Sequence, residues 1–162
     1  MIDVSAAGLR AGDGPGPRGD SDAAALRAAI ESFYFAYRAF TAGPDRILDR
    51  RGLGRVHHRI LYFVGRNSAV SVKELLDILE VTKQALNSPL RQLIEMGLIA
   101  AAIPPHDRRV RQLSLTGEGS RLEAQLTATQ TKLLSEAFAA AGSEANRGWL
   151  AVMRTISGGR RQ

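Results

Sequence analysis

Hydrophobic residues recur at helical spacing in several separate stretches of this chain. The first stretch, residues 21–42, carries a broad apolar stripe made of Leu26, Ile30, Phe33, Tyr34, Tyr37 and Phe40. Such spacing predicts an amphipathic helix, which Ser21 or Asp22 can cap at its start and which Gly43-Pro44 is expected to end. A stripe this rich in aromatic residues must pack on something large, either the core or a second copy of the chain.

Three more helical patterns follow along the chain. The second pattern contains Val56, Ile60, Leu61, Phe63 and Val64 and closes near residues 65–68; the third contains Leu122, Leu126, Leu133, Leu134, Ala137 and Phe138; the last contains Trp149, Leu150, Val152, Met153 and Ile156. Residues 45–51 form a short charged connector or a helical turn, and Gly142-Ser143 separates the last two helices. A coiled pair of the first and last helices would bury these stripes, and two chains are needed to cover them all.

The stretch from Ser71 to Thr116 has a different pattern. Ser71 can cap a helix, and Glu74 lies three residues later, which is the spacing of a capping box. Glu80-Val81 interrupts the apolar face of this helix, and Thr82 can cap the next one. Two helices joined by so short a break cross steeply, as in a helix-turn-helix.

The second helix of the pair presents a polar outer face. Ala85, Leu86, Leu90, Leu93 and Ile94 are expected to point inward, which leaves Lys83, Gln84, Asn87, Ser88 and Arg91 outside. Asn and Gln can pair with adenine, Arg can pair with guanine, and Ser and Lys can contact phosphates. An ordinary solvated face would mix in acids, and none precedes Glu95 here.

Pro89 lies inside this second helix, where it removes a backbone hydrogen bond to the carbonyl of Ala85 at a cost of about 3 kcal/mol. One alternative is a short helix that begins at Ser88 as cap with Pro89 at its first position. We favour a single helix from Thr82 to Met96, kinked at Pro89. Such a kink would change the aim of the residues before Pro89 relative to Arg91.

Two strand-like runs follow, and they predict a β-hairpin wing. Ile99–Ile103 and Val110–Leu115 are the strands, and residues 104–109 form the tip. The tip carries Asp107, Arg108 and Arg109, with Arg111 close behind. An arginine at such a tip can enter a narrow, negative minor groove of DNA, and a nearby aspartate can hold its guanidinium in place.

Composition agrees with a DNA-binding protein and narrows the alternatives. The net charge is +6, and only Lys73, Lys83 and Lys132 of the 22 basic residues are lysines; an arginine excess suits phosphate and base recognition. Without cysteine, the chain has no disulfide or Cys-ligated zinc. We find neither a membrane-spanning run nor a secretory signal, so we expect a cytoplasmic protein.

The motifs VTKQALNSPLRQLIEMGLI, Asp107-Arg108-Arg109 and LSLTGEG at 113–119 resemble the MarR family, the multiple-antibiotic-resistance type of winged helix-turn-helix regulator. The resemblance runs from about residue 21 to about 157 and is strongest at 71–121. It implies a homodimer whose recognition helices occupy successive major grooves of a pseudo-palindromic double-stranded operator. It also implies that Arg109, steadied by Asp107, enters the minor groove, and that a small aromatic or phenolic ligand releases the DNA.

Together these patterns predict a mainly α protein with a small β-hairpin wing. We expect a flexible tail at 1–20, an N-terminal dimerisation helix and connector at 21–51, a winged helix-turn-helix region at 52–116, C-terminal dimerisation helices at 117–157 and a basic tail at 158–162. The predicted DNA contacts are Ser71, Thr82, Lys83, Gln84, Asn87, Ser88, Arg91, Asp107, Arg108, Arg109 and Arg111. We expect the protein to be a sequence-specific transcriptional regulator that acts as a repressor.

Other classes of function fit the residues less well. A winged-helix module for protein partners would have an acidic or apolar outer face on its second helix, unlike the one here. No Ser–His–Asp set, phosphate-binding glycine loop or paired acids point to an enzyme or a cofactor. His57 and His58 lie about 100° apart on a helix and cannot jointly hold one metal without other ligands. An effector could instead contact Tyr34, Tyr37, Arg38, His57 and His58, where Arg38 with one histidine could bind a carboxylate.

Overall fold

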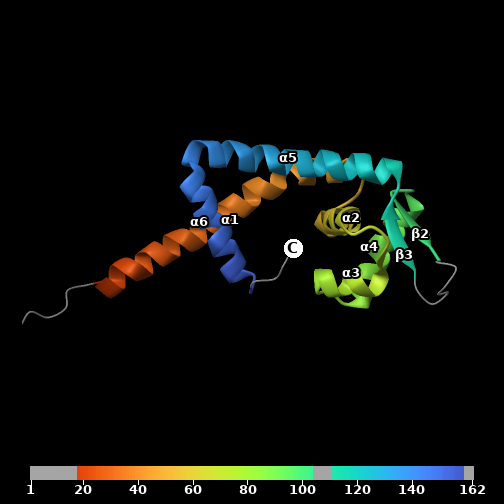
Figure 1. Ribbon diagram of the computed structural model, residues 1–162, viewed down its shortest axis with the longest axis horizontal. Helices are drawn as coiled ribbons and strands as arrows, with labels where there is room; N and C mark the ends of the chain where they lie inside the picture. The colour runs from red at the N-terminus through yellow and green to blue at the C-terminus, as the bar shows by residue number, and fades with distance from the viewer. Residues whose placement is uncertain (1–17, 104–110, 159–162) are drawn as a thin grey trace, which may run out of the picture. The chain divides into compact units, whose positions relative to one another are not determined.

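The chain is mainly helical and has a small three-stranded antiparallel sheet, whose two longer strands lie between the fourth and fifth helices in sequence (Figure 1). The computed structural model describes residues 18–103 and 111–158. The chain divides into two compact units between Tyr37 and Arg38. The helices are α1 (Arg18–Asp49), α2 (Arg55–Arg66), α3 (Val72–Leu79), α4 (Lys83–Glu95), α5 (Gly117–Ala141) and α6 (Ser143–Ile156).

Helix α1 does not end at Gly43-Pro44, so that prediction was wrong. It continues to Asp49, which agrees with the helical alternative for residues 45–51. Proline has no N–H to donate to the fourth residue before it, but its fixed φ is helical. Burial explains why the helix continues: Pro44 is buried and Leu48 is fully buried. Gly43 also lets α5 approach, because an added Cβ would lie 3.2 Å from the side chain of Thr129. Tertiary packing therefore outweighs the local helix-breaking signal.

The predicted wing hairpin is present, and a third strand that the sequence did not predict joins it. Strands β2 (Ile99–Ala102) and β3 (Gln112–Leu115) pair antiparallel, and β1 (Val70–Ser71) pairs with the other side of β3. Val70 lies opposite Leu113, so a buried side chain faces another in this register. Two residues are too few to show alternation, which is why β1 left no pattern in the sequence.

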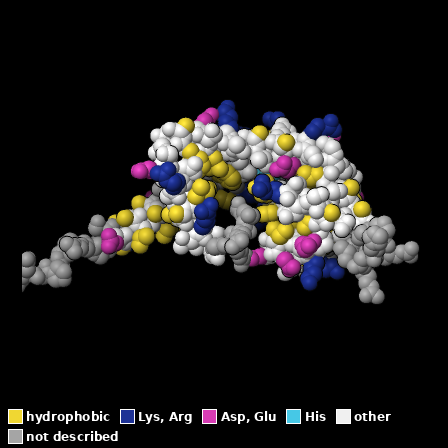
Figure 2. Space-filling view, in the orientation of Figure 1, with side chains coloured by type: hydrophobic (Ala, Val, Ile, Leu, Met, Phe, Trp, Pro, Cys, Tyr) yellow, Lys and Arg dark blue, Asp and Glu magenta, His cyan; other side chains and the backbone are white. Residues whose placement is uncertain are grey.

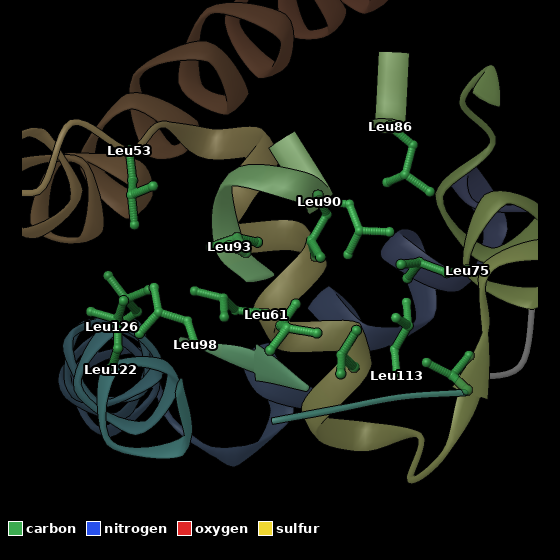
Figure 3. Packing of buried hydrophobic residues seen from close by; sticks show 14 of the residues in the cluster. Leu53, Leu61, Leu75, Leu86, Leu90, Leu93, Leu98, Leu113, Leu122 and Leu126 are labelled. Carbon is green, nitrogen blue, oxygen red and sulfur yellow. The ribbon is translucent and has the colours of Figure 1, made fainter. Parts of the chain in front are cut away.

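A leucine-rich core holds α2, α3, α4, the sheet and the start of α5 together. Its fully buried members include Leu61, Leu75, Leu86, Leu93, Leu98, Leu113, Leu122 and Leu126. Figure 3 shows these side chains gathered between the helices and the sheet. Leu86, Leu90 and Leu93 point inward as predicted, but Ala85 is exposed. Burial of whole leucine side chains is worth about 1.5–3 kcal/mol each, so this core is the main stabiliser of the unit.

Helix α5 begins against the backbone that leaves α4. The Thr116 hydroxyl donates to Gly97 O at 2.7 Å and accepts from the N–H of Gly119 at 3.0 Å. Gly119 is buried, and a Cβ added there would overlap the carbonyl oxygen of Leu98. The Thr116 N–H donates to that same Leu98 oxygen at 3.1 Å. The first turn of α5 is therefore fixed to the end of the helix pair by backbone-to-backbone contact.

Most of the exposed large apolar side chains among the described residues lie on two helices. On α1 they are Leu26, Ile30, Phe33, Tyr34, Phe35 and Tyr37, and on α6 they are Trp149, Leu150, Val152 and Ile156. Figure 2 shows hydrophobic side chains over much of the visible surface of the N-terminal part of α1. Trp149 contacts Phe138 of α5 edge to face, with ring centroids 5.5 Å apart. No described helix is long and apolar enough to cross a membrane.

The close approach at Gly119 predicts that Gly119→Ala destabilises the chain by about 1–3 kcal/mol, the usual cost of overpacking. The Leu98 carbonyl is backbone and cannot rotate away from the new methyl group. Gly117→Ala is the matched control, because it lies in the same first turn and an added Cβ there meets nothing within 4 Å. Urea denaturation of both variants measures the difference, and equal midpoints would contradict the packing argument.

Candidate nucleic-acid interface

Helices α3 and α4 form a helix-turn-helix whose two starts are both capped as predicted. Ser71 Oγ accepts from the N–H of Glu74 at 3.1 Å, and the Glu74 carboxylate accepts from the N–H of Ser71 at 2.8 Å. The hydrogen bonds that Ser71 donates to the Glu74 carboxylate, first from its N–H and then from its side chain, lower the pKa of Glu74, since they favour its ionised form. Thr82 Oγ1 accepts from the N–H of Ala85 at 3.2 Å. The capping box and the second cap thus fix where each helix begins.

The turn between the helices is made by Glu80, which has a left-handed backbone with φ 53°. Its N–H donates to Leu76 O at 2.8 Å, closing α3. Val81 is half-buried and packs against the leucine core, so it fills the inside of the turn. The turn is short because one left-handed residue reverses the chain.

Helix α4 is one continuous helix through Pro89, as favoured from the sequence, and the alternative start at Ser88 was wrong. It ends in a Schellman motif, in which the Leu98 N–H donates to Leu93 O at 2.9 Å and the Gly97 N–H donates to Ile94 O at 3.0 Å. Gly97 supplies the positive φ of 68° that this motif needs. The position of α4 is thus set by a cap at one end and a glycine stop at the other.

The exposed side of α4 carries the polar row predicted from the sequence: Lys83, Gln84, Asn87, Ser88 and Arg91 are all exposed. There is no acid in the first turn of α4, so the positive end of the helix dipole is left open to an anion. Arg91 lies 3.8 Å from Glu95, and both side chains are about seven-tenths exposed. An exposed pair of this kind is worth less than about 1 kcal/mol, so Arg91 can leave it for a stronger partner.

Three further predicted DNA contacts, Ser71, Thr82 and Arg111, lie outside helix α4 among the described residues. Ser71 is half-buried and Thr82 is exposed, and each hydroxyl oxygen accepts a capping bond at the start of its helix. Arg111 is exposed just before β3. Asp107, Arg108 and Arg109 lie outside the described residues.

The predicted effector residues fall in different surroundings. Tyr34, Tyr37 and Arg38 are exposed on α1, and His58 is half-buried on α2. His57 is buried with both ring nitrogens engaged: the Gly54 N–H donates to Nδ1 at 2.9 Å, and Nε2 lies 3.0 Å from Gln92 Oε1. A ligand could use His57 only by displacing one of these bonds. Within the described parts of the chain, no group of three His, Asp or Glu side chains is placed to hold a metal ion.

The bond between His57 and Gln92 was missed by the sequence-based prediction. Gln92 was assigned to neither face of its helix, although it lies between the buried residues Leu90 and Leu93. A polar residue within an apolar stripe is a signal for a buried hydrogen bond. Its partner could not have been identified from spacing, because 35 residues separate the two side chains.

Comparison with known proteins agrees with this geometry. Residues 51–110 match the MarR family profile. The HTH-type transcriptional regulator PetP of Rhodobacter capsulatus is 44% identical over 131 residues, which are 81% of this chain and 79% of PetP.

Two solved structures share the fold at low sequence identity. Staphylococcus aureus MarR in complex with salicylate and kanamycin has a TM-score of 0.69 and 21% identity, covering 85% of this chain and 93% of that one. A point mutant of S. aureus MepR bound to an oligodeoxyribonucleotide has a TM-score of 0.58 and 16% identity, covering 80% and 96%. With PetP, the profile match and the capped helix pair beside a three-stranded sheet, they show that the chain belongs to the MarR family of DNA-binding transcriptional regulators.

Proposed function

We propose that this regulator is a homodimer that binds a pseudo-palindromic operator in double-stranded DNA and represses transcription until a small aromatic ligand releases it. The observation that carries the proposal is the exposed row of amides and cations on α4, which has no acid in its first turn. Such a helix fits a major groove, where phosphates attract it and base edges accept or donate hydrogen bonds.

The side chains of α4 divide by chemistry into two tasks. Gln84 and Asn87 can pair with adenine and Arg91 with guanine, while Lys83 and Ser88 suit phosphates. The hydroxyls of Ser71 and Thr82, at the starts of the two helices, can donate hydrogen bonds to the phosphate backbone of the DNA. In the wing, we propose that Arg109 enters the minor groove with Asp107 beside it, flanked by phosphate contacts from Arg108 and Arg111.

Exposed apolar surface on α1 and α6 supports the dimer. Phe33 and Tyr34 on α1 are more than half exposed, as are Val152 and Ile156 on α6. Exposed apolar surface on a helix marks an interface, and two-fold pairing of identical chains is the commonest way to cover it. A two-fold dimer presents two copies of α4, so its operator would have matching half-sites.

The proposal that a ligand releases the repressor from DNA is supported by the surroundings of His58 and by the resemblance to the MarR family. Burial lowers the pKa of His58, partly opposed by the carboxylates of Glu123 and Asp45. A neutral imidazole near two carboxylates can accept a hydrogen bond from a ligand hydroxyl, whereas a ligand carboxylate would be repelled there. This chemistry favours phenolic compounds as the effector. The salicylate in the S. aureus MarR complex carries both groups. Tyr34, Tyr37 and Arg38 complete the proposed set.

Substitution in α4 should change sequence preference. We expect Arg91→Ala and Gln84→Ala each to reduce discrimination at particular base pairs by about 1–3 kcal/mol. Arg109→Ala should weaken binding strongly while altering major-groove preference little. Selection from a randomised DNA library, followed by titration of the chosen sites at fixed salt, measures both effects, and native mass spectrometry should find two chains per site.

Lys132→Ala is the matched control for Arg91→Ala. Lys132 is exposed on α5 and forms an (i, i+4) pair with Glu136 at 4.0 Å, like Arg91 with Glu95. The Lys132→Ala variant loses one positive charge outside α4 and should keep the same preference for DNA sequence. Equal loss of affinity for all DNA sequences in the α4 variants would show that the helix contacts phosphates only.

A phenolic ligand should stabilise the dimer and weaken its hold on DNA. We expect phenol- or salicylate-type compounds to raise the melting temperature of the purified protein, because a ligand that binds only the folded state shifts the unfolding equilibrium. His58→Leu should remove this shift. Benzoate, which lacks the hydroxyl, is the control ligand. No increase with any compound would contradict the effector proposal.

The buried position of His58 also predicts a pH dependence of stability. Its pKa in the folded chain is below the ordinary value of 6.5, so the unfolded chain binds the proton more tightly. The contribution of His58 to the free energy of unfolding is therefore fully present above about pH 6.5, and it is lost as the pH falls toward the pKa of the folded chain. Urea denaturation at about pH 7.5 and about pH 5 should show a smaller decline for His58→Gln than for the unmodified chain. An unchanged decline would contradict this assignment.

A further inference from the structure

His57 is a buried histidine whose two ring nitrogens both have hydrogen-bond partners. It is 8% exposed. The Gly54 N–H can only donate, so Nδ1 must accept, and the proton of a neutral ring then lies on Nε2. Nε2 therefore donates to Gln92 Oε1 across 3.0 Å. The ring thus links the start of α2 with the recognition helix α4.

Gln92 continues this chain of hydrogen bonds. Its amide Nε2 donates to Gly52 O at 3.2 Å, which orients the amide so that Oε1 faces His57. The two glycines at the ends belong to one turn, in which Gly52 has a φ of 67° and Leu53 is buried at 4% exposure. Each donor meets an acceptor along the whole path from Gly54 to Gly52, so the network is satisfied and has one orientation.

Gln92 lies just beyond the weakest turn of α4. Pro89 has no N–H, so the carbonyl of Ala85 lacks its usual helical partner, and the two halves of α4 share one bond fewer. Leu86 anchors the first half and Leu93 the second, both fully buried. Apolar contacts are non-directional. They set how deeply the second half of α4 packs into the core, but they define its rotation about the helix axis less well. The hydrogen bond from His57 is directional and acts on the residue next to Arg91.

We propose that His57, acting through Gln92, is a positioning residue for DNA recognition: it fixes the rotation of the second half of α4, and with it the aim of Arg91, without touching DNA. This role rests on the proposed function of α4 as the base-reading helix. The hydrogen bonds take both nitrogens of His57, which also explains why a histidine stands at a buried position of α2 that is otherwise apolar.

The test compares His57→Leu, Gln92→Leu and the double variant with the full-length protein. We expect each to fold, to keep its affinity for mixed-sequence DNA within about twofold, and to lose about tenfold in discrimination at the base pair that Arg91 reads. The double variant should lose no more than either single one, because both remove the same bond. Selection from a randomised DNA library and urea denaturation give the two readouts.

His57→Gln is the rescue variant. Glutamine at this third helical position can accept from the Gly54 N–H with Oε1, as in a capping box, and can donate from Nε2 to Gln92. It should restore most of the discrimination. Gln125→Leu, an exposed glutamine on α5, is the control for the Gln92 change and should leave preference unaltered. Ring ¹⁵N NMR should find Nδ1 of His57 unprotonated in the unmodified chain.

The outcomes separate this inference from the function on which it rests. If the unmodified protein selects no DNA sequence, both are overturned. If it selects a sequence and His57→Leu and Gln92→Leu select the same one equally well, only the positioning role is overturned. Loss of discrimination in step with loss of folded protein, without rescue by His57→Gln, also overturns it. If His57→Leu does not fold, Gln92→Leu and His57→Gln decide alone, since both keep the acceptor for Gly54.

Discussion

The fold depends on a backbone contact between Gly119 and the carbonyl of Leu98. That carbonyl sits where α4 has just ended in its Schellman turn and β2 is about to begin, and it also accepts the N–H of Thr116. Three elements thus meet through main-chain atoms, with no side chain between them. A side-chain contact can adjust by changing rotamer, whereas this one cannot, so the direction of α5 follows directly from the end of α4. The leucine core then fills the space that this geometry leaves.

Much of the fold could be predicted because its signals are local. The capping residues Ser71, Glu74 and Thr82 act within one helical turn, so the residues themselves carry the information. The failures came where distant residues decide the outcome. Helix α1 passes through Pro44 because Pro44 and Leu48 are buried, and β1 exists because Val70 has Leu113 as a partner.

The same division applies to the candidate site. The exposed row on α4 follows from helical periodicity once the inward leucines are known, and Ala85 was misplaced because a methyl group is too small to reveal which side it prefers. The His57–Gln92 bond depends on the packing of α2 against α4 and has no local signature. The predicted effector residues form no pattern that periodicity could test, and the pKa of His58 depends on Glu123 of α5, a neighbour that sequence distance hides.

The edge-to-face contact of Trp149 with Phe138 has a practical consequence. Trp149 is the single tryptophan of the chain, it is 41% exposed, and it lies on α6 among the exposed apolar residues. Indole emission depends on the polarity around the ring, so the light from this one residue reports whether water or another surface covers α6. The protein therefore carries an intrinsic optical probe of whatever covers α6, located on a different helix from the polar row of α4.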